Sequence, residues 1–275
     1  MKIVFASERP SDPHALVLPI AKGGDTADMA LAPLVKRAAE TARFDGETAA
    51  VVELLAPADR PETRILLLGI GDSALADAGA FERAGGAVTA RLLTSGETRV
   101  VIDVTGLDPA IGLASAAARL AYGALLRGWR YDVYRTRLPE KQRPSVTEII
   151  VVGGGPHAEA AFAPLARIAD GVAFARELVT EPANVIYPES FVERCQRLAE
   201  LGVRIRVLDE AEMRALGMGA LLGVSQGSAR APRLLALEWD GTGGRATPPV
   251  VLVGKGVTFD TGGISIKPAA GMEDM

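Results

Sequence analysis

The chain has 275 residues, a formal net charge of −4 and 48% hydrophobic residues. This length suggests two domains or one large one, and the apolar content is enough for a substantial core, which excludes wholesale disorder. Residues 1–150 carry 18 basic and 19 acidic residues, and residues 151–275 carry 12 and 15. Neither half therefore has the basic excess of a dedicated nucleic-acid-binding protein.

The N-terminus and the cysteine content indicate the compartment. The single cysteine, Cys195, excludes an intrachain disulfide and fits a reducing environment. The charged pair Glu8-Arg9 comes before any apolar region of a signal peptide could develop, and the apolar stretch 216–229 is too short to span a bilayer. We expect a soluble cytoplasmic protein with no membrane association.

Short β-branched runs alternate with alanine-rich helical stretches over the first 150 residues. This alternation favours an α/β fold with right-handed crossovers. The predicted strands are 1–6, 50–55, 64–68, 99–104 and 148–152, and the predicted helices are 30–41, 74–93 and 109–126. The last helix is expected to have Asp108 as its N-cap and Pro109 in its first turn.

A Gly-Gly-Gly-Pro breaker at 153–156 ends this region. The long helical pattern that follows connects two strand-rich regions, which predicts an N-terminal domain over 1–155, a linker helix over 156–182 and a second domain over 183–275. The later elements are expected to be a helix at 188–201, a strand at 203–208, a short helix capped by Asp209, and strands at 233–239 and 249–253. No closing helix or strand follows, so we expect a second domain that is cut part-way.

Residues 69–74 read Gly-Ile-Gly-Asp-Ser-Ala and resemble the dinucleotide fingerprint G-x-G-x-x-A. The acidic residue that should bind the ribose is not at the expected spacing of about 20 residues, because the next strand ends at Asp103. Asp72 would also place a negative charge at the phosphate site. An ordinary strand-to-helix turn is the favoured interpretation, and a nicotinamide-dependent oxidoreductase is the alternative.

Residues outside these motifs give little sign of catalysis. His14 and His157 belong to no metal-binding spacing, and Cys195 lies on an apolar helix face, which predicts a core thiol.

The segment 249–268 is different, because a buried-looking strand runs into glycines and just three charges, Lys255, Asp260 and Lys267, occur in it. Charges isolated in such a sequence must be paired, hydrated or metal-bound. The alternative is that the lysines reach solvent and Asp260 caps a turn.

Residues 253–268, Val-Gly-Lys-Gly-Val-Thr-Phe-Asp-Thr-Gly-Gly-Ile-Ser-Ile-Lys-Pro, resemble the metal-site signature of the leucine aminopeptidases, peptidase family M17. Segments 128–132, 176–184 and 217–228 resemble other parts of that family. The resemblance implies an N-terminal macro-like α/β domain, a linker helix and the first part of a catalytic α/β domain with a mixed sheet. It also implies a homohexamer that releases N-terminal residues, leucine preferred, from peptides with two divalent metal ions, Mn²⁺ or Zn²⁺.

By residue matching, the resemblance implies that Lys255 ligates one metal through its neutral amine and that Asp260 ligates or bridges both. Lys267 would be the catalytic lysine, whose charge stabilises the oxyanion of the tetrahedral intermediate. One carboxylate and one amine are too few for two hard cations, so we expect this span alone to be inactive. The alternative is a non-catalytic assembly or ligand-binding module for nucleotide or nucleic acid, although the charge balance of residues 1–150 weakens a nucleic-acid role.

Overall fold

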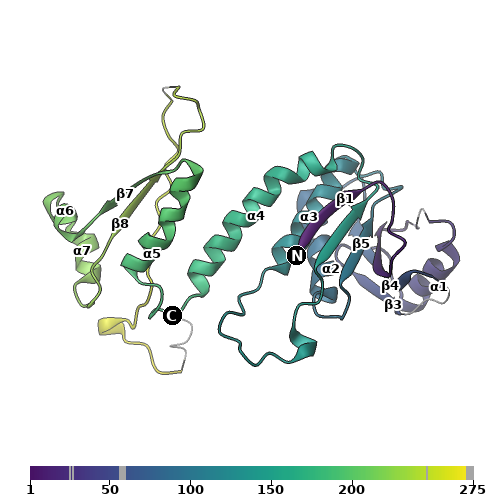
Figure 1. The fold of residues 1–275 in the computed structure, drawn as a ribbon, viewed down its shortest axis with the longest axis horizontal. Coiled ribbons are helices and arrows are strands. Elements are labelled where there is room, and N and C mark those ends of the chain that lie inside the picture. Colours follow the sequence, from purple (N-terminus) through teal and green to yellow (C-terminus); the bar gives the residue numbers. More distant parts are fainter. Residues whose placement is uncertain (25, 27, 56–59, 246, 271–275) are drawn as a thin grey trace. The chain divides into compact units, whose positions relative to one another are not determined.

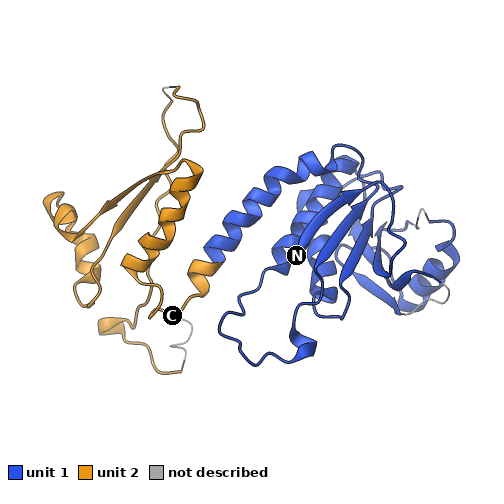
Figure 2. Ribbon diagram, in the orientation of Figure 1, with its two compact units in different colours: residues 1–176 blue, residues 177–275 orange. Residues whose placement is uncertain are grey.

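The computed structural model describes residues 1–24, 26, 28–55, 60–245 and 247–270. The chain forms two compact units, residues 1–176 and residues 177–275 (Figure 2). The division falls inside one long helix, and the domain boundaries expected at 155 and 182 stay a prediction. Within the described ranges, no helix is both long enough and apolar enough to cross a membrane.

Six strands of the described part of unit 1 form one sheet, in the order β1-β6-β5-β2-β4-β3 (Figure 1). They are β1 (Lys2–Ala6), β2 (His14–Ala21), β3 (Val51–Leu55), β4 (Glu62–Gly71), β5 (Arg99–Asp103) and β6 (Glu148–Val152). β3 runs antiparallel to β4, and the other neighbouring strands run parallel. The predicted α/β class is confirmed, and all five strands expected in this region are present.

The sequence analysis missed β2, the strand that lies between β5 and β4. β2 contains Pro19, and proline favours edge strands or non-strand segments because it has no amide hydrogen to donate. The pairing of β2 with β5 covers only Ala15 to Val17, so Pro19 lies where β2 is paired with β4 alone. Almost the whole strand is buried, and this burial outweighs the one missing donor.

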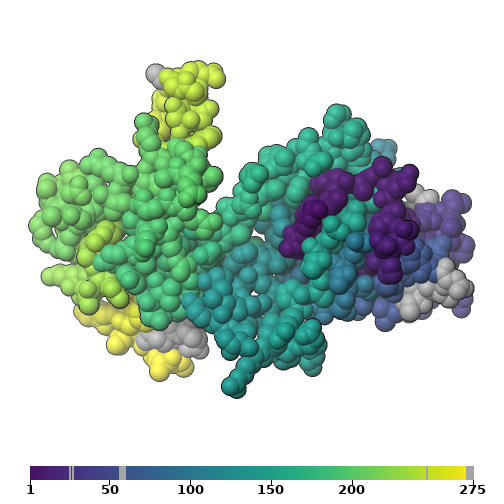
Figure 3. Space-filling model, in the orientation of Figure 1, coloured from purple at the N-terminus to yellow at the C-terminus, as the bar shows by residue number. Residues whose placement is uncertain are grey.

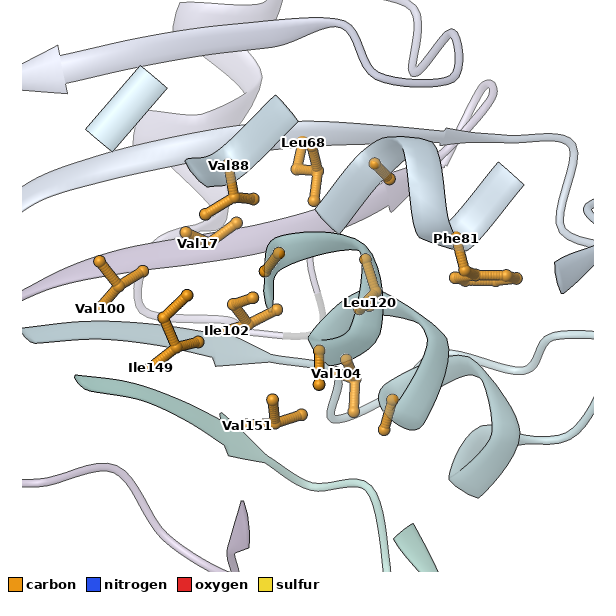
Figure 4. Packing of buried hydrophobic residues seen from close by; sticks show 14 of the residues in the cluster. Val17, Leu68, Phe81, Val88, Val100, Ile102, Val104, Leu120, Ile149 and Val151 are labelled. Carbon is orange, nitrogen blue, oxygen red and sulfur yellow. The ribbon is translucent and has the colours of Figure 1, made fainter. Parts of the chain in front are cut away.

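Helices cover both faces of this sheet. On one face α1 (Ala32–Ala42) packs through Val35, and on the other face lie α2 (Ala78–Leu92) and α3 (Leu113–Gly128). The α2–α3 face buries the larger apolar cluster, in which Phe81, Val88 and Leu120 meet alternate residues of the strands (Figure 4). These strand residues include Val17, Leu68, Val100, Ile102, Ile149 and Val151.

Two glycines allow α2 and α3 to pack with their backbones in contact. A Cβ atom at Gly85 would collide with the carbonyl oxygen of Leu120, and one at Gly123 would collide with the carbonyl oxygen of Glu82. The close approach is therefore reciprocal, with each helix supplying one glycine and one carbonyl group.

α3 begins later than the sequence predicted. Its N-cap is Gly112 at φ +80°, and the Gly112 amide donates to the Pro109 carbonyl oxygen in a turn that precedes the helix. The assignment of Asp108 as N-cap and Pro109 to the first helical turn is therefore wrong. The positive φ at Gly112 interrupts the chain before helical geometry starts.

The glycines of segment 69–74 serve close packing. β4 continues to Gly71, and α2 starts only at Ala78. A Cβ atom at Gly69 would collide with the carbonyl oxygen of Glu47, so the glycine is needed where a neighbouring loop crosses the strand. In a dinucleotide site the helix starts directly after the glycines. The geometry therefore agrees with the ordinary strand-to-helix turn.

Arg9 connects three carboxylates of unit 1. Its guanidinium lies 2.7 Å from Asp28 and 2.5 Å from Asp103, and it approaches Glu62 to 3.9 Å. Partial burial by itself would raise the pKa of Asp28. The hydrogen bond and the charge of Arg9, with two backbone amides, outweigh that effect, and the net pKa of Asp28 is lowered. Arg9 thus ties the β1–β2 connection to the end of β5 and to the segment before α1.

The elements that follow β6 belong to the long helix and to unit 2. They are α4 (Ala158–Thr180), α5 (Pro188–Cys195), η2 (Gln196–Leu201), β7 (Arg204–Leu208), α6 (Glu210–Ala215), α7 (Gly219–Ser225), β8 (Leu234–Glu238) and η3 (Gly263–Ser265). β7 and β8 pair antiparallel. The long helix, the helix after Pro188 and the strands expected at 203–208 and 233–239 are confirmed.

Two local predictions for unit 2 are confirmed as well. Asp209 caps α6 in a capping box, because its carboxylate accepts from the Glu212 amide at 2.9 Å and the Glu212 carboxylate accepts from the Asp209 amide at 3.0 Å. Cys195 is 3% exposed, and burial raises the pKa of its thiol. This cysteine is therefore a core residue.

The strand expected at 249–253 is wrong. These residues have no regular secondary structure, and the side chains of residues 250–253 are 72–93% exposed. A strand forms only where a neighbour pairs its backbone groups. In the part of unit 2 that the structure describes, β7 and β8 pair with each other, and neither pairs with this segment.

We expect Gly85→Ala to lower the free energy of unfolding by about 1–3 kcal/mol, because the added methyl group forces α2 away from α3. The matched control is Gly86→Ala on the same helix, where the nearest atom to a new Cβ lies 3.7 Å away. Alanine's higher helix propensity should raise its stability by about 0.5–1 kcal/mol. Urea denaturation measures both, and equal stability of the two variants would contradict the reciprocal packing.

Arg9→Met leaves three carboxylates without their countercharge, and we expect a loss of about 2–4 kcal/mol at neutral pH. The folded-state pKa of Asp28 is lowered, so its stabilising contribution is present above the unfolded pKa of about 3.9 and is lost as the pH falls through the folded value. The difference between the two proteins should therefore shrink below about pH 4. Urea denaturation at neutral and acid pH tests this. Lys22→Met, which removes an exposed pair with Asp45, is the control.

Candidate active site

A tight turn over residues 260–267 brings two of the three predicted site residues together. The carboxylate of Asp260 accepts a hydrogen bond from the Gly262 amide at 2.8 Å. The Lys267 amide donates to the Thr261 carbonyl oxygen at 2.9 Å, which folds the chain back on itself. The Lys267 ammonium then lies 3.6 Å from the second carboxylate oxygen of Asp260. An ion pair therefore closes the turn.

The backbone of this turn requires glycine at position 262. Gly262 has φ +104°, a conformation that residues with a side chain rarely adopt. A Cβ atom there would collide with the carbonyl oxygen of Ser265 and lie 3.0 Å from the Lys267 ammonium. The missing side chain is what leaves room for Lys267 to fold over the turn.

Lys255 lies on a stretch without regular secondary structure, and its side chain is exposed. Asp260 is 55% exposed and Lys267 is 30% exposed at the side chain. Among the described residues, Asp260 forms its ion pair with Lys267, and none is found for Lys255. The structure therefore pairs two of the predicted site residues and leaves the third in solvent.

The donor groups of these residues are too few for the two-metal centre that the resemblance implies. Asp260 supplies the one carboxylate of the trio, and it is engaged by Lys267. Across the described ranges, no three His, Cys, Asp or Glu side chains gather in a metal-binding group. A hard divalent cation binds about six ligand atoms, and most of these are oxygen atoms. The residues described here therefore do not complete such a site, and no catalytic step follows from them through a metal.

The segment that leads into the turn, and the turn itself, carry exposed apolar side chains. The C-terminal segment, yellow in Figure 3, lies on the surface of unit 2, and many of its large side chains face solvent. The exposed apolar residues are Val250, Val251, Leu252, Val253, Val257, Phe259, Ile264 and Ile266. A run of exposed apolar side chains of this kind is typical of a segment that another part of a polypeptide covers.

Arginine contacts hold the remaining segments of unit 2 around α5. Arg194 contacts Glu177 at 3.1 Å and Glu181 at 2.6 Å, which fixes α5 to the end of α4. The guanidinium of Arg230 lies 3.8 Å from the centre of the Tyr187 ring, a cation–π contact that attaches the segment before β8 to the start of α5. One of the segments that the family resemblance singled out, residues 176–184, takes part in these contacts through Glu177 and Glu181.

Sequence reasoning selected Asp260 and Lys267 but did not predict that they pair. It assigned Asp260 to metal binding and Lys267 to stabilising the oxyanion, while the alternative of a turn capped by Asp260 agrees with the observed hydrogen bond to Gly262. The available signal was the glycine pair directly after Asp260-Thr261, because aspartate followed by glycine favours a turn.

The chain matches one family over both units. The profile of the cytosol aminopeptidase family, N-terminal domain, matches residues 17–138, and that of the catalytic domain of the same family matches residues 173–275. The chain belongs to the cytosol aminopeptidase family. Because the catalytic-domain profile matches, the alternative of a non-catalytic macro-type module is not favoured.

Curated relatives of the cytosol aminopeptidase family support this assignment. A probable cytosol aminopeptidase of Rhizobium etli (strain CIAT 652) is 46% identical over 259 residues, which are 93% of this chain and 51% of that protein. A probable cytosol aminopeptidase of Sinorhizobium fredii is 40% identical over 100% of this chain and 56% of its own length. The chain spans about half the length of the curated relatives that it matches.

Solved structures agree on the fold of this aminopeptidase family. The bottromycin maturation enzyme BotP has a TM-score of 0.71 and 29% identity, covering 93% of this chain and 52% of that one. The same enzyme in complex with Mn has a TM-score of 0.70 and 29% identity, with 95% and 51% covered. A mutant of tomato leucine aminopeptidase has a TM-score of 0.71 at 21% identity, with 86% and 50% covered, and supports the fold alone.

We expect Gly262→Ala to open the 260–267 turn, because the new Cβ cannot coexist with the Ser265 carbonyl group. Hydrogen exchange measures this at the Lys267 amide, which should exchange at least about tenfold faster once its bond to Thr261 is lost. Gly256→Ala is the control, since a Cβ there meets open space. Unchanged exchange in Gly262→Ala would contradict the turn.

Proposed function

We propose that this chain contributes the N-terminal domain and part of the catalytic machinery of a metal-dependent aminopeptidase that releases N-terminal residues, leucine preferred, from peptides. The observation that carries the proposal is the agreement of both units with one peptidase family, in which the catalytic-domain match includes Lys255, Asp260 and Lys267. The Mn complex of BotP supports metal dependence.

Each of the three residues has a chemical property suited to one role. Asp260 supplies the hard oxygen donor that a divalent cation prefers, and Lys255 supplies an amine that ligates only when neutral. The ammonium group of Lys267 would stabilise negative charge that develops on the substrate carbonyl oxygen. The turn at Gly262 would set the position of Lys267 relative to Asp260 before substrate binds.

We also propose that the 275-residue span has no peptidase activity by itself and that the active assembly is a homo-oligomer, a hexamer by family resemblance. The single carboxylate of the trio supports the first point, because two dications need more oxygen ligands than these residues supply. The family resemblance is what supports the second.

A chimera tests the proposed roles. Residues 1–275 replace the matched part of the Rhizobium etli relative, and hydrolysis of a leucine anilide is measured with Mn²⁺ or Zn²⁺. The chimera should be active and the 275-residue chain inactive. Lys267→Met in the chimera should lower kcat by about a hundredfold or more with little change in KM, the pattern of a group that acts in the transition state.

Lys22→Met is the matched control, because Lys22 is an exposed lysine of unit 1 whose removal should leave kcat unchanged. A chimera that keeps its kcat after Lys267→Met would contradict the role of Lys267. Activity of the isolated 275-residue chain that disappears in Lys267→Met would contradict the proposed inactivity of the span.

A further inference from the structure

Three carboxylates are buried on the face of the unit 1 sheet that α1 covers. Asp103 lies two residues after Val101, which packs in the apolar cluster under α1, so both side chains point to that face. Asp28 comes shortly before α1, and Glu62 starts β4. We name Asp28, Glu62 and Asp103 the carboxylate cluster. Their side chains are 7–18% exposed, so unit 1 itself encloses the cluster.

The guanidinium of Arg9 occupies the carboxylate cluster. Its Nε donates to Asp103 at 2.5 Å, and a terminal nitrogen donates to Asp28 at 2.7 Å. Burial by itself would lower the pKa of Arg9, but the hydrogen bonds and charges of these two carboxylates outweigh that effect and raise it. Arg9 lies on the connection between β1 and β2, which has no regular secondary structure. The contacts of its guanidinium, and no helix or strand around it, therefore hold Arg9 in place.

Arg9 leaves part of the carboxylate cluster unused. Its guanidinium approaches Oε1 of Glu62 only to 3.9 Å, which is beyond hydrogen-bond distance. Glu62 is 7% exposed, and its Oε2 has no hydrogen-bond partner among the residues that the structure describes. A buried acceptor without a donor destabilises the fold. The cluster thus contains an acceptor that Arg9, attached to its own backbone, does not reach.

A second acceptor without a donor lies at the start of β2. His14, the register partner of Glu62, is 1% exposed. Its Nδ1 lies 2.8 Å from the Asp12 carbonyl oxygen, which makes Nδ1 the donor and leaves Nε2 as an acceptor. Within the described ranges, Nε2 also lacks a hydrogen-bond partner. The neighbouring strands β2 and β4 therefore each begin with a buried acceptor that has no donor.

We propose that the carboxylate cluster is a binding site for a guanidinium cation, which Arg9 fills in the unaltered chain and which binds free guanidinium once that side chain is removed. A planar guanidinium donates to carboxylates in a fixed fork, whereas an ammonium is a compact point charge. Free guanidinium is not restrained by a backbone, so it can also donate to Oε2 of Glu62. It would thus satisfy an acceptor that Arg9 leaves without a donor.

Chemical rescue tests the site. Arg9→Ala removes the occupant, and circular dichroism follows melting of the 275-residue chain with guanidinium chloride at about 10 mM, far below denaturing concentrations. For a Kd of about 1 mM, this raises the folded-to-unfolded ratio about tenfold, a rise of about 3–6 °C in melting temperature. Ammonium chloride and urea should give no rise, because ammonium lacks the planar fork and urea lacks the charge. The unaltered chain should not respond, because its tethered Arg9 fills the cluster.

Further variants distinguish the carboxylate cluster from general binding of guanidinium. Arg99→Ala is the matched control, because Arg99 also pairs with two carboxylates, of which Asp12 is 74% exposed, and it should not respond. In the Arg9→Ala background, Asp103→Asn should abolish the response, since it removes a carboxylate that binds the cation. Glu62→Gln in that background should weaken the apparent affinity for guanidinium about tenfold, which tests the contact to Oε2.

Three results would overturn the proposal. They are no response of Arg9→Ala to guanidinium, a response that ammonium reproduces, or an equal response of Arg99→Ala. If Arg9→Ala does not fold in buffer, guanidinium should restore a cooperative melting transition, and failure to do so counts as no response. The inference is independent of the peptidase proposal, because the carboxylate cluster lies in unit 1 and the proposed catalytic residues lie in unit 2.

Discussion

The opposite charges of Asp260 and Lys267 meet because a backbone turn holds them together. A solvent-exposed ion pair contributes only about 0–1 kcal/mol, too little to define the path of eight residues. The left-handed conformation of Gly262 and the backbone hydrogen bond from Lys267 to Thr261 define that path. The ion pair then follows from the backbone, which means that the relative position of the two groups is set before any ligand arrives.

In unit 1, local sequence patterns predict most of the strands, whereas β2 and the start of α3 depend on pairing and backbone conformation that those patterns do not report. Five of its strands follow from short β-branched runs, because β-branched residues favour strands. β2 was not predicted because proline is rare inside a central strand, and β2 contains Pro19. Proline is tolerated there because β2 pairs only with β4 at that position. The start of α3 was misplaced because Gly112 adopts a conformation that sequence spacing does not reveal.

At the candidate site, too, the sequence predicted which residues matter but not how the backbone brings them together. Residue chemistry and family resemblance were enough to select Lys255, Asp260 and Lys267. The pairing of Asp260 with Lys267 depends on the φ angle of Gly262, which no periodicity reports. The apolar run before Lys255 has the composition of a buried strand, yet it lies in solvent, since a strand needs neighbours that the described part of unit 2 does not supply.

The proposed function assigns Asp260 to a metal site of the complete enzyme. Manganese content per chain, measured by elemental analysis after gel filtration, tests this most directly in the chimera with the Rhizobium etli relative. Two ions per chain are expected, and Asp260→Asn should reduce that number without changing the fold. An Asp260→Asn chimera that retains the full manganese content would contradict the claim.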